Sequence, residues 1–300
     1  MVRRTFMEWV EADPLRQPLE ASGFFKNFAK RYVAGEDIFE ALAVSKNFIQ
    51  DNYLVSLAYL QKNATNPNEA ASTHQVYLEM LEQISLAKLN DKVEVSIKPS
   101  QLGNKEKAGS HLFSIITKAK EYEIPVIIEV DDGDDPDWIF EITKTLHAEY
   151  PSCGFTLLSE LRGAQAQAEE LTNQEVRVRL TRGTYKTPEW RGYQKMIDVD
   201  RSYVKCLRTL LEGSAKVTVA THDSRLIEIA GFIAADVQRE AGSVEFQITH
   251  GMPKRNHERL LNFDQPVRVY LPFGPDWYPY VMRRITHAPE SLFQTVKSYL

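Results

Sequence analysis

Basic and acidic side chains gather at the ends of short apolar segments, where they could bind an anionic ligand. Lys98 ends the run VEVSIK and Glu129 lies near the end of the next run, PVIIEV. Two adjacent arginines, Arg283 and Arg284, follow YPYVM near the end of the chain. An arginine presents planar, paired N–H donors that match the oxygens of a carboxylate or a phosphate. An ion pair of Lys98 with Glu129 and a solvated helix face for the arginines are the simpler interpretations.

Other polar residues stand at the ends of further apolar runs. They are Asp131 with Asp132, Arg179 with Arg182, Thr221 with His222, Gln247 and Tyr270, and the apolar Leu158 ends one further run. A charged group inside an apolar strand is hard to explain by packing alone, because burial requires a partner. A divalent-metal site built from Glu129, Asp131 and His222 is the competing interpretation. The cations of the same region would repel a metal ion, so an anionic ligand is favoured.

The elements that must position these residues are eight short runs rich in β-branched and apolar residues. They cover residues 53–60, 93–98, 125–130, 154–158, 176–182, 216–221, 244–249 and 267–271. Longer amphipathic stretches separate them, a pattern that predicts parallel strands joined by helical crossovers. Eight such units, with no Gly-x-Gly-x-x-Gly turn after the first, favour a (β/α)8 TIM-type barrel over an open α/β sheet. In such a barrel the strand ends meet at one mouth.

Helical segments flank the predicted barrel. Residues 1–50 form an N-terminal helical segment, in which the Gly-Glu-Asp sequence at 35–37 starts a helix. Residues 51–300 form the catalytic barrel domain. Its last part, FGPDWYPYVMRRITHAPESLFQTVKSYL, predicts a loop followed by a C-terminal helix over the barrel mouth.

Composition narrows the class of protein. The chain has 300 residues, is 43% hydrophobic and 26% charged, and carries a net charge of -5. This predicts a globular chain with a large core, and not a binder of nucleic acid, which needs a basic surface. Cys153 and Cys206 form neither a disulfide framework nor a zinc site, so packed thiols in a reducing compartment are expected. No run approaches the roughly 20 apolar residues of a membrane span. We therefore expect a cytoplasmic protein, and attachment to the inner membrane surface stays open.

Five motifs, in order, resemble those of the proline dehydrogenase family. They are VSIKPSQLG, VRVRLTRGTY, VATHDS, VEFQITHGM and YLPFGPDWYPYVMRR. RYVAGEDIFEALAVSKNF is similar to the helical lead-in of that family, so the resemblance covers nearly the whole chain. It implies a distorted (β/α)8 barrel that holds FAD without a covalent bond, oxidises L-proline to 1-pyrroline-5-carboxylate and passes electrons to a quinone.

The resemblance also implies roles for individual residues. Arg283, Arg284 and Lys98 would hold the substrate carboxylate, and Tyr270 and Tyr280 would pack against the substrate ring. Glu129 stands where the family usually has an aspartate beside the lysine. The flavin would be bound by Arg179, Thr181, Arg182, Gly183, Thr221, His222 and Gln247.

The chain departs from the family pattern at five further positions. Leu158 replaces a glutamine that contacts the flavin, and Glu160 replaces an aromatic residue two positions later. Arg182 replaces the lysine of the K-G-x-Y motif, and His287 replaces a glutamate after the paired arginines. Thr249 replaces an apolar residue and would place a hydroxyl near the substrate ring. The changes at the flavin edge affect the expected affinity for the cofactor. Thr249 affects the expected identity of the imino acid.

Three alternatives to proline oxidation stay open. The first is a dehydrogenase of a modified proline, such as a hydroxylated one, in a biosynthetic pathway. The second is a metal-dependent barrel hydrolase or isomerase. The third is a non-catalytic relative that has lost flavin and binds a ligand or partner.

Overall fold

The computed structural model describes residues 22–131, 134–183, 187–252, 255–262 and 264–287. Asp132 and the motif residues Thr184 and Tyr185 therefore lie outside the described residues, as do the predicted helical parts at 1–21 and 288–300. His287 ends the last described helix, but its side chain is outside the described part.

Eight parallel strands close into a barrel in sequence order, and the last strand pairs with the first. The strands are β1 (Leu54–Tyr59), β2 (Val93–Ile97), β3 (Val126–Ile128), β4 (Cys153–Leu158), β5 (Arg177–Thr181), β6 (Val217–Ala220), β7 (Glu245–Thr249) and β8 (Val267–Phe273). Each overlaps with one of the eight apolar runs. The predicted (β/α)8 barrel is confirmed.

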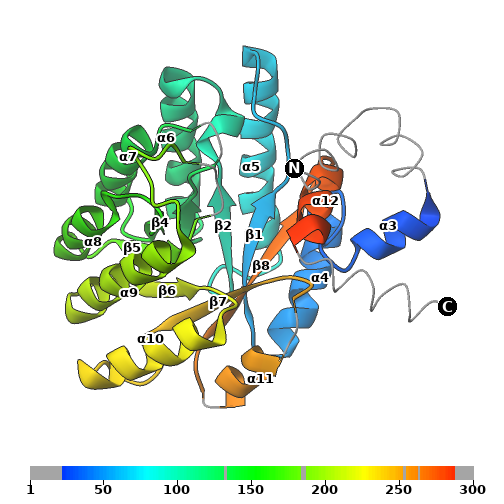
Figure 1. Cartoon of the computed structure of the whole chain (residues 1–300). Helices are drawn as coiled ribbons and strands as arrows, with labels where there is room; N and C mark the ends of the chain where they lie inside the picture. Colours follow the sequence, from blue (N-terminus) through cyan, green and yellow to red (C-terminus); the bar gives the residue numbers. More distant parts are fainter. Residues whose placement is uncertain (1–21, 132–133, 184–186, 253–254, 263, 288–300) are drawn as a thin grey trace.

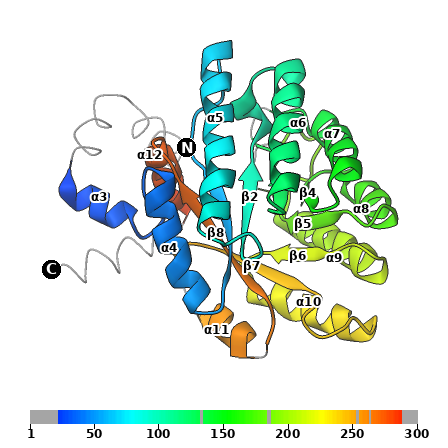
Figure 2. The same cartoon turned by 180° about the vertical axis from the view of Figure 1, so that it is seen from behind.

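Helices form an outer layer around these strands (Figures 1 and 2). They are α3 (Gly23–Ala29), α4 (Ile38–Gln50), α5 (Pro67–Leu86), the 3-10 helix η1 (Pro99–Leu102), α6 (Lys105–Glu121), α7 (Pro136–Glu149), α8 (Ala164–Asn173), α9 (Met196–Glu212), α10 (Ser224–Asp236), α11 (Arg255–Asn262) and α12 (Trp277–His287). The short helices α3 and α12 lie beside one another, apart from the main ring (Figures 1 and 2). No helix in the described ranges is both long and apolar enough to cross a bilayer.

Polar caps set the starts of several helices. The Asp37 carboxylate accepts hydrogen bonds from the backbone N–H groups of Phe39 and Glu40, so α4 begins where the Gly-Glu-Asp sequence predicts. Asp135 caps α7 in the same way, accepting from the N–H groups of Asp137 and Trp138. This is a structural role for one residue of the acidic segment that follows β3.

The strands separate an apolar layer from a polar barrel interior. Buried aliphatic residues such as Val55, Leu57, Val95 and Ile97 belong to the main core cluster, together with side chains of the surrounding helices. The residues between them in sequence are polar, and those of opposite strands bond across the barrel. Because side chains alternate between the two faces of a strand, one face packs on helices and the other fills the interior.

Arg179 on β5 is the centre of this interior. Its Nη2 atom lies 2.8 Å from Glu94 Oε1 on β2 and 2.9 Å from Ser56 Oγ on β1. Its Nη1 atom lies 2.7 Å from Glu129 Oε1. Since β1 and β5 are opposite strands of the closed barrel, the guanidinium spans the interior. A buried cation of this kind is tolerated only when carboxylates surround it.

Two further arginines complete an interior charge network with Glu94 and Glu245. Arg177 Nη2 donates to Glu94 Oε2 at 2.9 Å, and Arg268 binds both oxygens of Glu245 at 2.7 and 2.8 Å. Burial alone would raise the pKa of Glu94. The neighbouring guanidiniums, Arg268 first, outweigh this and hold that pKa well below its usual range.

We predict that Glu94→Gln destabilises the fold strongly, because it leaves buried guanidiniums without a compensating charge. The expected loss of unfolding free energy is about 3–5 kcal/mol, measured by chemical denaturation. Glu212→Gln is the matched control, because Glu212 also accepts from an arginine, Arg208, but is 53% exposed. Its loss should stay within about 0.5 kcal/mol. Equal losses in the two variants would contradict the structural role of the network.

Candidate active site

Lys98 stands at the mouth of the barrel, directly after β2. Its Nζ atom lies 2.8 Å from Asp131 Oδ2, and the two side chains are 13% and 20% exposed. Burial would lower the pKa of Lys98, but Asp131 and then Glu129 outweigh it and raise that pKa, so the ammonium stays charged. The direct ion pair between Lys98 and Glu129, which was the simpler interpretation, is replaced by pairs of Lys98 with Asp131 and of Glu129 with Arg179. Asp131 takes the lysine because Glu129 is directed toward Arg179 in the interior.

Glu129 connects the mouth to the charged interior. Its Oε1 atom accepts from Ser96 Oγ at 2.6 Å and from Arg179 Nη1 at 2.7 Å. Its Oε2 atom accepts from the Tyr270 hydroxyl at 3.3 Å. The Arg179 guanidinium also lies 5.5 Å from the centre of the Tyr270 ring. These contacts fix the predicted site residues Glu129, Arg179 and Tyr270 relative to one another.

Helix α12 carries the paired arginines to the same mouth. It is held by an aromatic and aliphatic cluster with α3, formed by Phe28, Ala29, Tyr32, Val33, Leu60, Trp277, Tyr278, Val281 and Met282. Arg284 Nε donates to the Tyr280 hydroxyl at 3.1 Å, and Arg284 Nη2 donates to Thr249 Oγ1 at 3.1 Å. Arg283 is exposed, and its charge lowers the pKa of Lys98, against the larger effect of the carboxylates. Lys98, Arg283 and Arg284 thus belong to one electrostatic neighbourhood.

Tyr280 lies between these charges. Burial raises its pKa, and the Arg284 guanidinium opposes the shift. The charges of Lys98 and then Glu129 have smaller, opposite effects on the same pKa, so the Tyr280 hydroxyl lies near the ends of β2 and β3. The guanidinium of Arg284 is 5.4 Å from the Tyr280 ring centre. The predicted pocket residues from distant parts of the chain are therefore brought together.

The residues expected to bind flavin lie on the other side of the mouth, and several of them already bind other groups of the protein. Arg182 is held by two carboxylates, with Nε 2.8 Å from Asp200 Oδ1 and Nη2 2.6 Å from Asp223 Oδ2. Thr221 Oγ1 accepts from the Asp223 N–H at 3.2 Å. Thr181 ends β5, where its hydroxyl is 3.4 Å from the Leu157 carbonyl oxygen. Arg182 is engaged in ion pairs that sequence reasoning did not foresee.

The turn after β5 requires a glycine at position 183, and the side chain of Glu160 packs against it. Gly183 has φ +97°, which other residues rarely adopt, and a Cβ there would collide with the side chain of Glu160. Glu160 is buried, and its Oε1 atom accepts from Thr187 Oγ1 at 3.3 Å. The chain therefore places a carboxylate beside the turn where the family has an aromatic ring.

Buried polar atoms without partners provide a test of whether a flavin fits here. Among the described residues, the buried side-chain atoms without a hydrogen-bond partner include Gln247 Oε1 on β7, Thr156 Oγ1 on β4 and Arg179 Nε on β5. Buried polar atoms are normally satisfied, so these call for a ligand with both donors and acceptors. The flavin ring system carries both, and the donor set therefore fits it. Sequence reasoning missed Thr156, although its position two residues before Leu158 on β4 gives it the same side of the strand.

The competing metal site is not assembled. Glu129 and Asp131 bind the cations Arg179 and Lys98, and His222 Nε2 lies 3.2 Å from Thr249 Oγ1. Within the described part of the chain, no group of three or more metal-ligating side chains gathers.

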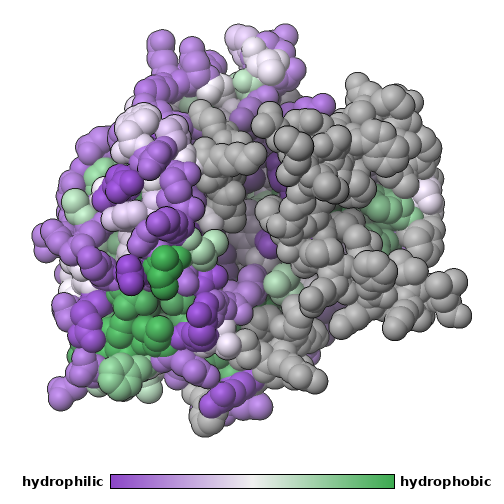
Figure 3. Space-filling view, in the orientation of Figure 1, coloured by the Kyte–Doolittle hydropathy of each residue, from purple (hydrophilic) through white to green (hydrophobic). Residues whose placement is uncertain are grey.

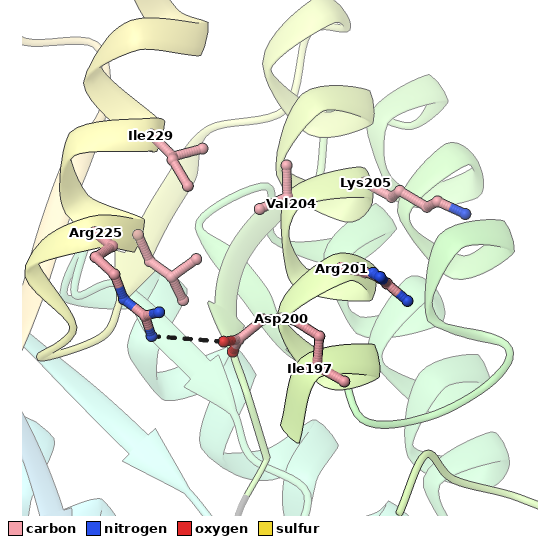
Figure 4. A pocket seen from close by; sticks show the side chains of 8 residues that line it. Ile197, Asp200, Arg201, Val204, Lys205, Arg225 and Ile229 are labelled. Carbon is pink, nitrogen blue, oxygen red and sulfur yellow. Dashed lines mark ion pairs between the residues drawn. The ribbon is translucent and has the colours of Figure 1, made fainter. Parts of the chain in front are cut away.

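A hollow lies on the helix layer, between α9 and α10. Apolar side chains gather on this outer face (Figure 3), where Ile197 and Phe232 are 56% and 69% exposed. The cavity has a volume of about 390 Å³, and Figure 4 shows Arg225 turned toward Asp200 at its edge, 3.8 Å apart. None of its lining residues is among the candidate site residues.

Asp134 provides a prediction about pH. Its Oδ2 atom accepts from the Asp131 N–H at 2.6 Å. Burial raises the pKa of Asp134 from 3.8 to about 6, and the hydrogen bond from Asp131 opposes the shift. A carboxyl with a raised pKa in the fold costs stability once it ionises, so stability falls as pH rises from about 4 through 6.

We therefore expect Asp134→Asn to stabilise the protein more at about pH 8 than at about pH 4. The difference in its effect on the free energy of unfolding should be about 2 kcal/mol, measured by denaturant titration at each pH. The control is Asp91→Asn, at a side chain that is 75% exposed, which should change stability little at either pH. A constant effect of Asp134→Asn at both pH values would refute the proposed cost of burial.

Known proteins similar to this chain point to one family. The family model described as proline dehydrogenase matches residues 41–287. Proline dehydrogenase 1 of Bacillus subtilis is 26% identical over 275 residues, which cover 91% of this chain and 90% of the relative. Proline dehydrogenase of Deinococcus radiodurans is 30% identical over 284 residues, with 91% and 90% covered.

The solved structure of proline utilization A from Bdellovibrio bacteriovorus has the same barrel fold. Its TM-score is 0.81 at 19% identity over 87% of this chain, and this chain spans 32% of that longer protein. The family model covers most of the chain, including the strands and both arginines of α12. The chain therefore belongs to the proline dehydrogenase family of enzymes, as its motifs predicted.

Proposed function

We propose that this protein binds FAD non-covalently at the barrel mouth and oxidises L-proline to 1-pyrroline-5-carboxylate. The observation that carries the proposal is the grouping of Lys98, Arg283 and Arg284 beside a barrel interior that still has unsatisfied polar atoms. The cations suit a carboxylate, and the unsatisfied atoms suit a flavin ring. Family membership supports the same conclusion.

The substrate carboxylate would be held by the cations of the mouth. Lys98 gives one hydrogen bond to Asp131, which orients its ammonium and leaves its other N–H donors for the substrate. Arg284 uses Nε and Nη2 for Tyr280 and Thr249, and Nη1 has no partner in the described part of the chain. These cations fix the position of the ring carbon next to nitrogen, and such orientation contributes several kcal/mol to catalysis.

The flavin would be held by Gln247, Thr156 and Arg179, with His222 and Thr221 at its side. When bound, it supplies the hydride acceptor. The positive charge of Arg179 would favour negative charge on that ring system. Arg179 is itself held by Glu94 and Glu129, so it needs no rearrangement during the reaction.

Proton transfer needs no dedicated protein base in this arrangement. The substrate amine loses its extra proton to solvent before reaction, and its lone pair then forms the C=N bond as the C–H bond breaks. Glu129 accepts hydrogen bonds from Ser96, Arg179 and Tyr270. Glu129 would therefore hold Arg179 and Tyr270 in position and would not remove the proton.

We also propose an electron acceptor for the flavin and a cellular location for the reaction. A quinone would reoxidise the flavin, as the family resemblance implies. Quinones dissolve in the membrane, so we place the reaction in the cytoplasm at the inner membrane surface.

Two residues beside the expected flavin site, Leu158 and Glu160, favour weak binding of the cofactor. Leu158 is buried and has no side-chain hydrogen-bonding group, and the Glu160 carboxylate lies against Gly183. Both changes remove favourable contacts for a flavin. A non-catalytic relative is therefore the alternative that the experiment must separate.

The visible spectrum of the purified protein tests the proposal. We expect flavin absorbance, either directly or after FAD is added and excess is removed. Anaerobic L-proline should then bleach it. A folded protein that stays colourless after FAD addition would support the non-catalytic alternative, and coloured protein that proline does not bleach would refute proline as substrate.

Arg284→Ala should raise KM for proline by about 10- to 100-fold, because it removes charge-assisted hydrogen bonds to the carboxylate. Arg201→Ala is the matched control, since Arg201 lies on the outer helix α9 and is 71% exposed. Steady-state kinetics on both variants check the effect. An unchanged KM in Arg284→Ala would show that α12 does not bind the carboxylate.

A further inference from the structure

Thr249 lies at the end of β7, between a cation from α12 and a histidine that follows β6. Its Oγ1 atom accepts from Arg284 Nη2 at 3.1 Å. The same oxygen is 3.2 Å from His222 Nε2. One hydroxyl therefore joins the side expected to bind carboxylate to the side expected to bind flavin.

The hydrogen-bonding capacity of this hydroxyl is largely used by the protein. A guanidinium can only donate, so Thr249 Oγ1 must give one lone pair to Arg284. Its own O–H then serves His222 Nε2, or its second lone pair accepts from the ring N–H, depending on the tautomer. In both cases two contacts within the protein hold the hydroxyl.

Arg284 gains a fixed orientation from this contact. Tyr280 holds Nε from the same helix, Thr249 holds Nη2 from β7, and the guanidinium faces the Tyr280 ring. Two anchors on different elements set both the position and the rotation of a planar group. Arg283, in contrast, is exposed. Arg284 is therefore the more rigid part of the expected carboxylate site, with Nη1 directed by the anchors.

We propose that Thr249 is a positioning residue, which aligns Arg284 for the substrate carboxylate and ties it to His222. The inference rests on the proposed function. It assigns the hydroxyl to Arg284 instead of to a polar substituent on the substrate ring. A hydroxylated proline that donated to Thr249 Oγ1 would have to compete with Arg284 or His222 for its lone pairs.

The test compares Thr249→Val, which keeps the shape and removes the hydroxyl, with Thr249→Ser, which keeps the hydroxyl. KM and kcat are measured with L-proline and with trans-4-hydroxy-L-proline. Binding of cyclopentanecarboxylate, which has the ring and the carboxylate but no amine, is measured by the change in flavin absorbance. The FAD content of each variant is determined alongside.

For Thr249→Val we expect KM for proline and the Kd of cyclopentanecarboxylate to rise together by about tenfold, the effect of one hydrogen bond to a charged group. kcat should change far less, and FAD content should not change. Thr249→Ser should restore both constants to near the wild-type values. The preference for proline over hydroxyproline should be the same in all three proteins.

A double variant separates positioning of Arg284 from a general effect on the fold. Thr249→Val should add nothing to KM in an Arg284→Ala background, because its effect acts through that guanidinium. Independent, multiplicative effects would overturn the proposal, as would an unchanged KM and Kd in Thr249→Val. A change confined to hydroxyproline would instead assign the hydroxyl to the substrate.

Failure of this inference is distinguishable from failure of the proposed function. A wild-type protein that neither binds FAD nor oxidises proline refutes the function and the inference together. An active wild-type protein whose Thr249→Val variant has the same KM and Kd refutes only the positioning role.

Discussion

The buried guanidinium of Arg179 imposes the main constraint on this structure. A cation inside a barrel must be surrounded by acceptors, and Glu94, Glu129 and Ser56 supply them from three other parts of the sheet. The polar residues Ser56, Glu94, Ser96 and Glu129 on the inner face of the barrel meet this requirement. Because Glu129 also accepts from Tyr270, the same constraint orders the floor of the mouth.

The charged groups are arranged differently in the barrel interior and at its mouth. In the interior, guanidiniums and carboxylates are matched and close to one another. At the mouth, Lys98 is matched by Asp131, while α12 adds Arg283 and Arg284. The positive charge needed to attract a carboxylate is thus concentrated on α12, and the aromatic cluster with α3 fixes that helix in place.

The sequence predicts the barrel well, because strand and helix periodicities are local properties, and each of the eight apolar runs became a strand. It also predicts which residues stand at strand ends. It does not predict which carboxylate meets which cation. Lys98 binds Asp131, and Arg182 binds Asp200 and Asp223, because side-chain direction and the neighbouring helices decide these pairs. Glu94, Ser56 and Thr156 were missed, although their alternation with apolar residues marks them as facing the interior.

The most direct measurement is a crystal structure of the protein with FAD and cyclopentanecarboxylate bound. The arrangement described here predicts the ligand carboxylate within hydrogen-bond distance of Lys98 Nζ and Arg284 Nη1, with its ring between Tyr280 and the flavin. A carboxylate bound away from Lys98, with the side chains of α12 turned toward solvent, would contradict it.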